Sequence, residues 1–127
     1  MRPETADYLA KAREDIVNAR DWLDAVHRGS EAARVAYLAA FHAAQALIFE
    51  RTGKIAKTHR GVRSAFAQLT KDDARFDQDL RQLLGRGYQR KEIADYGVGP
   101  QPSMSEIEAR EMIDTAVRFI DCIASMI

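Results

Sequence analysis

The segment from Glu31 to Thr52 constrains the fold of this 127-residue chain most, because it is apolar on more than one face of a helix. Two stripes with helical spacing run along it, the first of Tyr37, Phe41, Ala44 and Ile48, the second of Leu38, His42, Gln45 and Phe49. A helix with so wide an apolar face is predicted to lie in the middle of a bundle, or to share one face with a partner chain.

Four further segments carry apolar residues three and four positions apart, the spacing of an amphipathic helix. The first is predicted from Glu4 to His27, followed by a break at residues 28–30 in which Gly29 stops the helix and Ser30 caps the next. The others are a short helix capped by Thr58, a helix opened by a capping box at residues 70–73, and a last helix opened by a box at residues 103–106. The fourth helix is expected to carry Phe76 on its apolar face, and Gly53 is expected to end the second.

The fold class predicted from these segments is all-α, an up-and-down bundle of four long helices plus a short one. Residues 1–127 are expected to form a single domain, since 127 residues is an ordinary length for one. The sequence shows neither the apolar run of a signal peptide nor about 20 consecutive apolar residues, so no membrane association and a cytoplasmic location are expected. The single Cys122 and the histidine spacing predict no disulfide, no metal site and no cofactor.

The basic residues are unevenly distributed, although 19 basic and 19 acidic side chains cancel overall. Nine of the nineteen stand in two short segments without a carboxylate: Arg51, Lys54, Lys57, Arg60 and Arg63, and then Arg81, Arg86, Arg90 and Lys91. Two interpretations are open. The segments are either solvated helix faces or the two halves of one anion-binding surface.

Several of these residues stand in a sequence pattern that resembles the HEPN family (higher eukaryotes and prokaryotes nucleotide-binding). The similar parts are the helix Tyr-Leu-Ala-Ala-Phe-His-Ala-Ala-Gln-Ala-Leu-Ile-Phe from Tyr37, the segment Lys-Thr-His-Arg-Gly-Val after Gly53, and Arg-Lys-Glu-Ile-Ala-Asp-Tyr from Arg90. The resemblance covers roughly residues 5 to 125. It implies a small helical domain that dimerises, binds nucleotides or RNA, and often pairs with a nucleotidyltransferase in a toxin–antitoxin system.

Ribonucleases of the HEPN family carry an arginine, four to six residues and then a histidine at the end of one helix. Arg90 matches the arginine, whereas Asp95 stands in place of the histidine and Tyr96 follows it. A carboxyl group with an ordinary pKa of about 3.9 exchanges protons poorly at neutral pH, unlike a histidine at about 6.5. Three interpretations stay open: ion pairs of Asp95 with Lys91 and of Arg90 with a neighbouring acid, phosphate binding without cleavage, or a competent catalytic site formed by Arg90, Asp95 and Tyr96.

Four more residues are candidate nucleotide- or RNA-binding residues: His42, Lys57, His59 and Arg60. Lys57, His59 and Arg60 surround a helix start, where free amides favour an anion, although the same residues would also suit an exposed helix cap. His42 lies on an apolar stripe and could equally be a hydrogen-bonded core residue. The resulting hypothesis is a homodimer that binds RNA or nucleotide at a basic cleft, as a metal-independent ribonuclease toxin beside a nucleotidyltransferase. The alternative is a catalytically silent module that docks to or regulates a nucleotidyltransferase.

Overall fold

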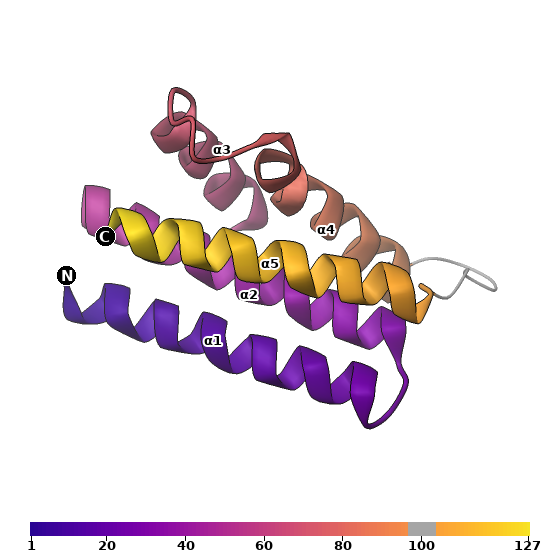
Figure 1. Cartoon of the computed structure of the whole chain (residues 1–127). Helices are drawn as coiled ribbons and strands as arrows, with labels where there is room; N and C mark the ends of the chain where they lie inside the picture. Colours follow the sequence, from indigo (N-terminus) through magenta and orange to yellow (C-terminus); the bar gives the residue numbers. More distant parts are fainter. Residues whose placement is uncertain (97–103) are drawn as a thin grey trace.

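The computed structural model of the chain describes the backbone of residues 1–96 and 104–127 and the side chains of residues 1–89 and 104–127. The described residues form five α-helices: α1 (Pro3–Asp24), α2 (Gly29–Thr52), α3 (His59–Thr70), α4 (Gln78–Tyr96) and α5 (Glu106–Met126). α1, α2 and α5 lie side by side as three long rods, while α3 and α4 lie together on the other side of α2 (Figure 1). The predicted all-α bundle of four long helices and one short helix is confirmed.

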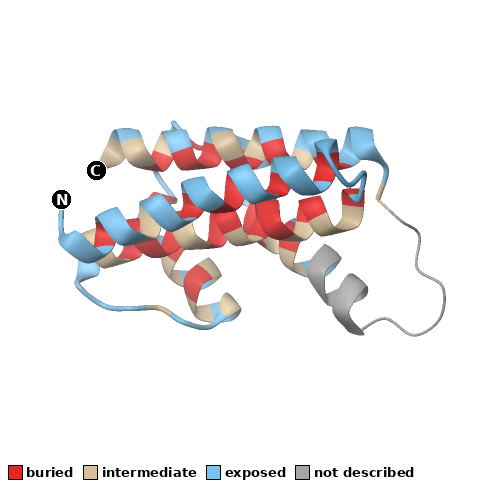
Figure 2. Ribbon diagram, turned by 90° about the horizontal axis from the view of Figure 1, so that it is seen from below, coloured by how far each residue is buried: buried red, intermediate tan, exposed pale blue. Residues whose placement is uncertain are grey.

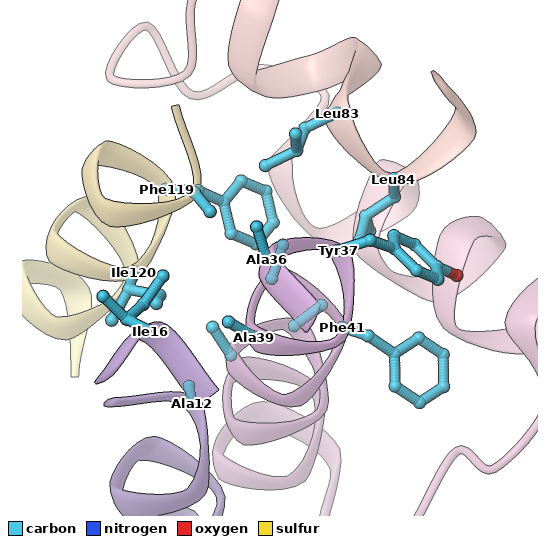
Figure 3. Packing of buried hydrophobic residues seen from close by; sticks show 14 of the residues in the cluster. Ala12, Ile16, Ala36, Tyr37, Ala39, Phe41, Leu83, Leu84, Phe119 and Ile120 are labelled. Carbon is cyan, nitrogen blue, oxygen red and sulfur yellow. The ribbon is translucent and has the colours of Figure 1, made fainter. Parts of the chain in front are cut away.

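α2 lies at the centre of the bundle, since it packs against each of the other four helices. Eight of its 24 residues are alanine, and all of these except Ala33 have no exposed area. Small side chains let α1 and α5 approach closely, and Ile16 and Ile120 meet beside α2 (Figure 3). The prediction that α2 lies in the middle of the bundle is therefore confirmed, and buried residues are concentrated along it (Figure 2).

α2 is also long and apolar enough to cross a membrane by length and composition, with a mean hydropathy of 1.3 over its most apolar window. The sequence expectation that no segment reaches this threshold was wrong. Within the bundle, however, 72% of that window is buried against the other helices. A core helix of a globular protein passes the same test, because both environments favour apolar side chains.

Two of the predicted helix boundaries were wrong, the end of α1 and the start of α2. α1 ends at Asp24 instead of His27, because His27 adopts a left-handed φ of 58° that no regular helix contains. α2 begins at Gly29, so Ser30 is inside the helix, where its hydroxyl accepts a hydrogen bond from the Met104 amide. Gly53 does end α2, with a left-handed φ of 70° that glycine adopts without steric cost.

The capping boxes were also assigned to the wrong residues. Thr70 is the last residue of α3, and its hydroxyl donates to the Phe66 carbonyl instead of accepting from a following amide. α4 begins at Gln78, with the carboxylate of Asp77 accepting from the Leu80 amide, so Phe76 precedes the helix. The capping box of α5 is formed by Ser105 and Glu108, and the predicted partner Ser103 lies outside the described residues.

Candidate functional site

An open groove of 740 Å³ runs between α3 and α4. Four of its lining residues are basic and none is acidic. The basic residues are Arg63, Lys71, Arg81 and Arg86, and the others are Phe66, Ala67, Thr70, Gln82, Leu84, Gly85 and Gln89. The groove is thus a concentration of positive charge on a chain whose formal net charge is zero.

The four cations of the groove differ in how they are held. Arg81 donates to two backbone carbonyls, those of Thr70 at 2.8 Å and Asp73 at 2.6 Å, and so ties the turn after α3 to α4. The guanidinium of Arg63 lies 5.0 Å from the centroid of the Tyr88 ring, and its buried Nε has no hydrogen-bond partner among the side chains of residues 1–89 and 104–127. The exposed side chains of Lys71 and Arg86 form no ion pair with any residue whose side chain the structure describes. Their charges are available to an anion.

The carboxylate of Asp73, in the turn after α3, is paired with Arg75. The side chain and the backbone amide of Arg75 donate to Asp73 and lower the pKa of that carboxyl to about 2. Asp73 therefore stays ionised over the whole physiological range. Its ion pair is with Arg75, a residue outside the groove lining, and of the groove cations Arg81 also acts on it electrostatically.

An aromatic cluster adjoins the groove where α3 begins. The ring of His59 packs against Phe41 and Tyr88, with centroids 4.8 Å away in each case, and is stacked on Tyr37 at 5.6 Å. Its Nδ1 lies 2.5 Å from the hydroxyl of Tyr37, a residue with no exposed area. Tyr37 and Phe41 leave the same side of α2, toward α3 and α4 (Figure 3). His59 is thus held by both neighbouring helices.

Gly87 allows α4 to approach α2 at this point. A Cβ atom added there would lie 2.6 Å from Cδ2 of Tyr37, a distance that real Cβ contacts do not show. Any other residue at this position would push α4 away from the Tyr37 ring. The missing side chain of Gly87 therefore helps to place Tyr88 against His59.

His42 lies in a separate pocket of 480 Å³ whose lining includes Glu4, Asp7, Lys11 and Gln45. Its Nδ1 is 2.7 Å from the carboxylate of the buried Asp15 on α1, which also lies 3.6 Å from the ammonium of Lys11. The structure therefore does not bring His42 together with His59. The surroundings of His42 match one of the two interpretations given above, that of a hydrogen-bonded core residue. The carboxylates of Glu4 and Asp7 in the pocket lining would repel a phosphate.

The HEPN domain family model matches residues 5–126 of the sequence, nearly its whole length. The chain belongs to the HEPN family. Among solved structures, the crystal structure of TT1696 from Thermus thermophilus is similar, with a TM-score of 0.82 and 21% sequence identity over 99% of this chain and 100% of that chain. This likeness shows that the two chains share a fold. A search among curated proteins finds no match.

The residues of the HEPN ribonuclease pattern lie at the C-terminal end of α4. The backbone of α4 includes Arg90, Asp95 and Tyr96, while their side chains lie outside the described residues. Five residues of regular helix place the positions of Arg90 and Asp95 about 140° apart around the helix axis. The groove reaches Gln89, so Arg90 follows its last lining residue directly in the sequence.

The predicted segment around the start of α3 lies partly beside the groove. Thr58 caps α3 by accepting from the Gly61 amide at 2.9 Å, and His59 joins the aromatic cluster. Lys57 and Arg60 are exposed and do not line the groove. They are near it in sequence but do not contribute to its walls.

The two acid-free segments of the HEPN chain do meet, through part of their residues. Arg63 from the first segment and Arg81 and Arg86 from the second line one groove. Arg51 instead donates to the carbonyl of Met126 at the end of α5. Sequence reasoning missed Lys71 and the pairing of Tyr37 with His59. The only signal for the latter was the four-residue spacing that places Tyr37 and Phe41 on one face of α2.

Proposed function

We propose that this HEPN protein binds RNA or a nucleotide in the α3–α4 groove. The observation that carries the proposal is the set of four cations that line the groove without a carboxylate among the lining residues. Phosphate groups are recognised by such clusters, because each basic side chain that neutralises a phosphate releases condensed counterions. The volume of 740 Å³ lies within the usual range for ligand pockets.

The uncharged groups of the groove also suit a nucleic-acid ligand. Gln82 and Gln89 supply amide donors and acceptors, and Arg63 stacked on Tyr88 presents a flat cationic surface. Arginine planes and aromatic rings are the surfaces on which single-stranded bases stack. A double helix would need a broader surface than the groove between α3 and α4.

Cleavage of the bound RNA is the finer part of the proposal. The family's ribonucleases act without a metal, and Arg90 is retained at the end of α4. This chain would then act as a ribonuclease toxin beside a nucleotidyltransferase antitoxin, as a cytoplasmic homodimer. The replacement of the family histidine by Asp95 favours the second candidate, a silent module that docks to a nucleotidyltransferase.

Binding is tested with Lys71→Gln and Arg86→Gln, alone and combined, because both side chains line the groove and form no ion pair that the structure describes. Fluorescence anisotropy with a labelled single-stranded RNA is measured between about 50 mM and 300 mM salt. Each lost phosphate contact should reduce the slope of log K against log salt by about 0.7 for a single strand. Arg20→Gln, an exposed cation on α1, is the matched control and should leave the slope unchanged. Equal slopes for all variants would contradict the proposal.

The role of Asp95 is tested by Asp95→His, which restores the histidine of the family's ribonucleases. If the remaining site is competent, cleavage should rise by a factor on the order of 10²–10⁴. The products should be cyclic phosphates, and cleavage should survive EDTA and disappear with a 2′-deoxy substrate. RNA binding without cleavage by either protein would leave the silent module as the better description.

The homodimer is tested by sedimentation velocity at micromolar concentration. The expected mass is twice the 14.3 kDa of the chain. A single species of 14.3 kDa would contradict dimer formation, whatever the result of the RNA assays.

A further inference from the structure

The cations of the α3–α4 groove lie toward its two ends. The two helices run in opposite directions, because Arg81 near the start of α4 donates to the carbonyl of Thr70 at the end of α3. Farther along α4, the ring of Tyr88 lies against the guanidinium of Arg63 from the first half of α3. Lys71 directly follows Thr70 in the sequence and lines the groove at the end with Arg81. Arg63 marks the opposite end.

Each end of the groove combines a cation that the protein holds with one that is exposed. Arg81 is bonded to two backbone carbonyls, and Arg63 lies against Tyr88 with its Nε buried, so these two mainly contribute charge. Lys71 and Arg86 are exposed, and neither forms an ion pair that the structure describes. Arg86 stands five residues after Arg81, about 7.5 Å along the helix axis. It precedes Tyr88 by two residues, so it lies toward the end with Arg63.

Between its two ends the groove is lined by residues with little or no side chain. Ala67 on α3 stands four residues from Arg63 and four from Lys71, and it is exposed. Gly85 lines the groove from α4, four residues after Arg81. A Cβ atom added to Gly85 would meet no atom of the described residues within 4 Å, so packing does not require a glycine there, although glycine is unfavourable within a helix. An open space beside the backbone of α4 therefore lies in the middle of the groove.

We infer that the groove binds an internal nucleotide of a single-stranded RNA, with the nucleoside beside Gly85 and Ala67 and one phosphate at each end. An internal nucleotide has phosphates on both sides of its ribose, whereas a mononucleotide such as ATP has all of its phosphates on one side. Only the internal nucleotide brings one phosphate to Lys71 and another to Arg86. This inference rests on the proposed function, binding in the α3–α4 groove, and narrows the ligand to an RNA strand.

The first test compares three small competitors of a labelled single-stranded RNA: adenosine 3′,5′-bisphosphate, ADP and ATP. The bisphosphate and ADP contain the same atoms and differ in the position of one phosphate, while ATP carries at least as much negative charge. We expect the bisphosphate to compete about tenfold better than either, because its second phosphate gains a charged contact at the other end of the groove. Lys71→Gln and Arg86→Gln should each weaken its binding, and the two effects should add.

The second test places a methyl group in the middle of the groove. Gly85→Ala should weaken binding of the RNA and of the bisphosphate on the order of tenfold, because the ligand loses its close approach to α4. The same substitution should raise the Tm, so a loss of binding would not come from unfolding. Ala67→Gln should also weaken binding. Ser64→Gln is the matched control, since Ser64 is exposed on the same helix but does not line the groove.

The outcomes separate this inference from the proposed function. Equal competition by the three nucleotides, with RNA binding that still depends on Lys71 and Arg86, would overturn the inference and leave the proposed function standing. Unchanged RNA affinity in both Gly85→Ala and Ala67→Gln would overturn it in the same way. Absence of RNA binding by the wild-type protein would overturn the proposed function, and the inference with it.

Discussion

The two sides of α2 are built differently. On the side of α1 and α5, helices pack along their whole length over alanine, with Leu23, Phe119 and Ile120 almost completely buried. On the side of α3 and α4, the contacts with α2 are fewer, a groove opens between the helices, and its walls are basic. On this side, a hydrogen bond between the Tyr37 hydroxyl and Nδ1 of His59 links α2 to α3.

The difference separates stability from recognition within one small bundle. Burial of apolar area stabilises the chain mostly through α1, α2 and α5, so the α3–α4 side can keep cations that repel one another. A groove of like charges destabilises the folded chain slightly and is useful only if a ligand of opposite charge fills it. This reasoning predicts that mutations on the two sides affect different measurements.

The largest effect is expected from Leu47→Ala. Leu47 on α2 has no exposed area, so its truncation should lower the free energy of unfolding by about 2–5 kcal/mol. Leu69→Ala on α3 is the matched control, since 36% of that side chain is exposed, and should cost about 1 kcal/mol or less. Urea denaturation of both variants measures the difference. Similar losses would show that the buried Leu47 stabilises the chain no more than the partly exposed Leu69 does.

A smaller effect is expected from the two glycines of α4. Gly87→Ala should lower the free energy of unfolding by about 1–3 kcal/mol, because the new methyl group would meet the Tyr37 ring. Gly85→Ala, two residues earlier, meets nothing within 4 Å and should stabilise the helix by about 0.5–1 kcal/mol. Opposite signs in thermal unfolding would confirm the close approach of α4 to Tyr37. Stabilisation by both substitutions would contradict it.

The smallest effect is expected in the turn that joins α3 to α4. The pKa of Asp73 is lowered to about 2 by Arg75, so the unfolded chain binds more protons than the folded one as the pH falls below about 4. The stabilisation by this pair should be complete above about pH 4 and disappear as the pH falls through about 2. Asp73→Asn should flatten this part of the stability curve. The neighbouring Asp72→Asn is the control and should leave the curve as it is in the wild-type protein.

The helices could be predicted from the sequence because their signals are local. Spacing of three and four residues located all five, and Gly53 marked the end of α2 correctly. The start of α5 could not be assigned from local signals, because Ser103–Glu106 and Ser105–Glu108 fit the same capping pattern. The structure uses the second pair, Ser105 and Glu108. The amide of the preceding residue, Met104, donates to the hydroxyl of Ser30, 74 residues away.

The candidate site was predictable only in its composition. The acid-free segments pointed to Arg63, Arg81 and Arg86, and the segment Lys-Thr-His drew attention to His59. The partner of each histidine depends on helix packing, with Tyr37 lying 22 residues from His59 and Asp15 lying 27 residues from His42. No local spacing encodes such pairs, so His42 and His59 were placed in one group although the structure separates them.

Gly85 and Gly87 have a consequence for the motions of the chain. Each glycine costs a helix about 1 kcal/mol relative to alanine, so α4 holds its conformation through its neighbours more than through its own backbone. The amide hydrogens of α4 should consequently exchange with solvent through local opening, whereas those of α2 should exchange only when the whole chain unfolds. The wall of the groove would then sample other conformations more often than α2 does, and a ligand that bridges α3 and α4 would slow that exchange.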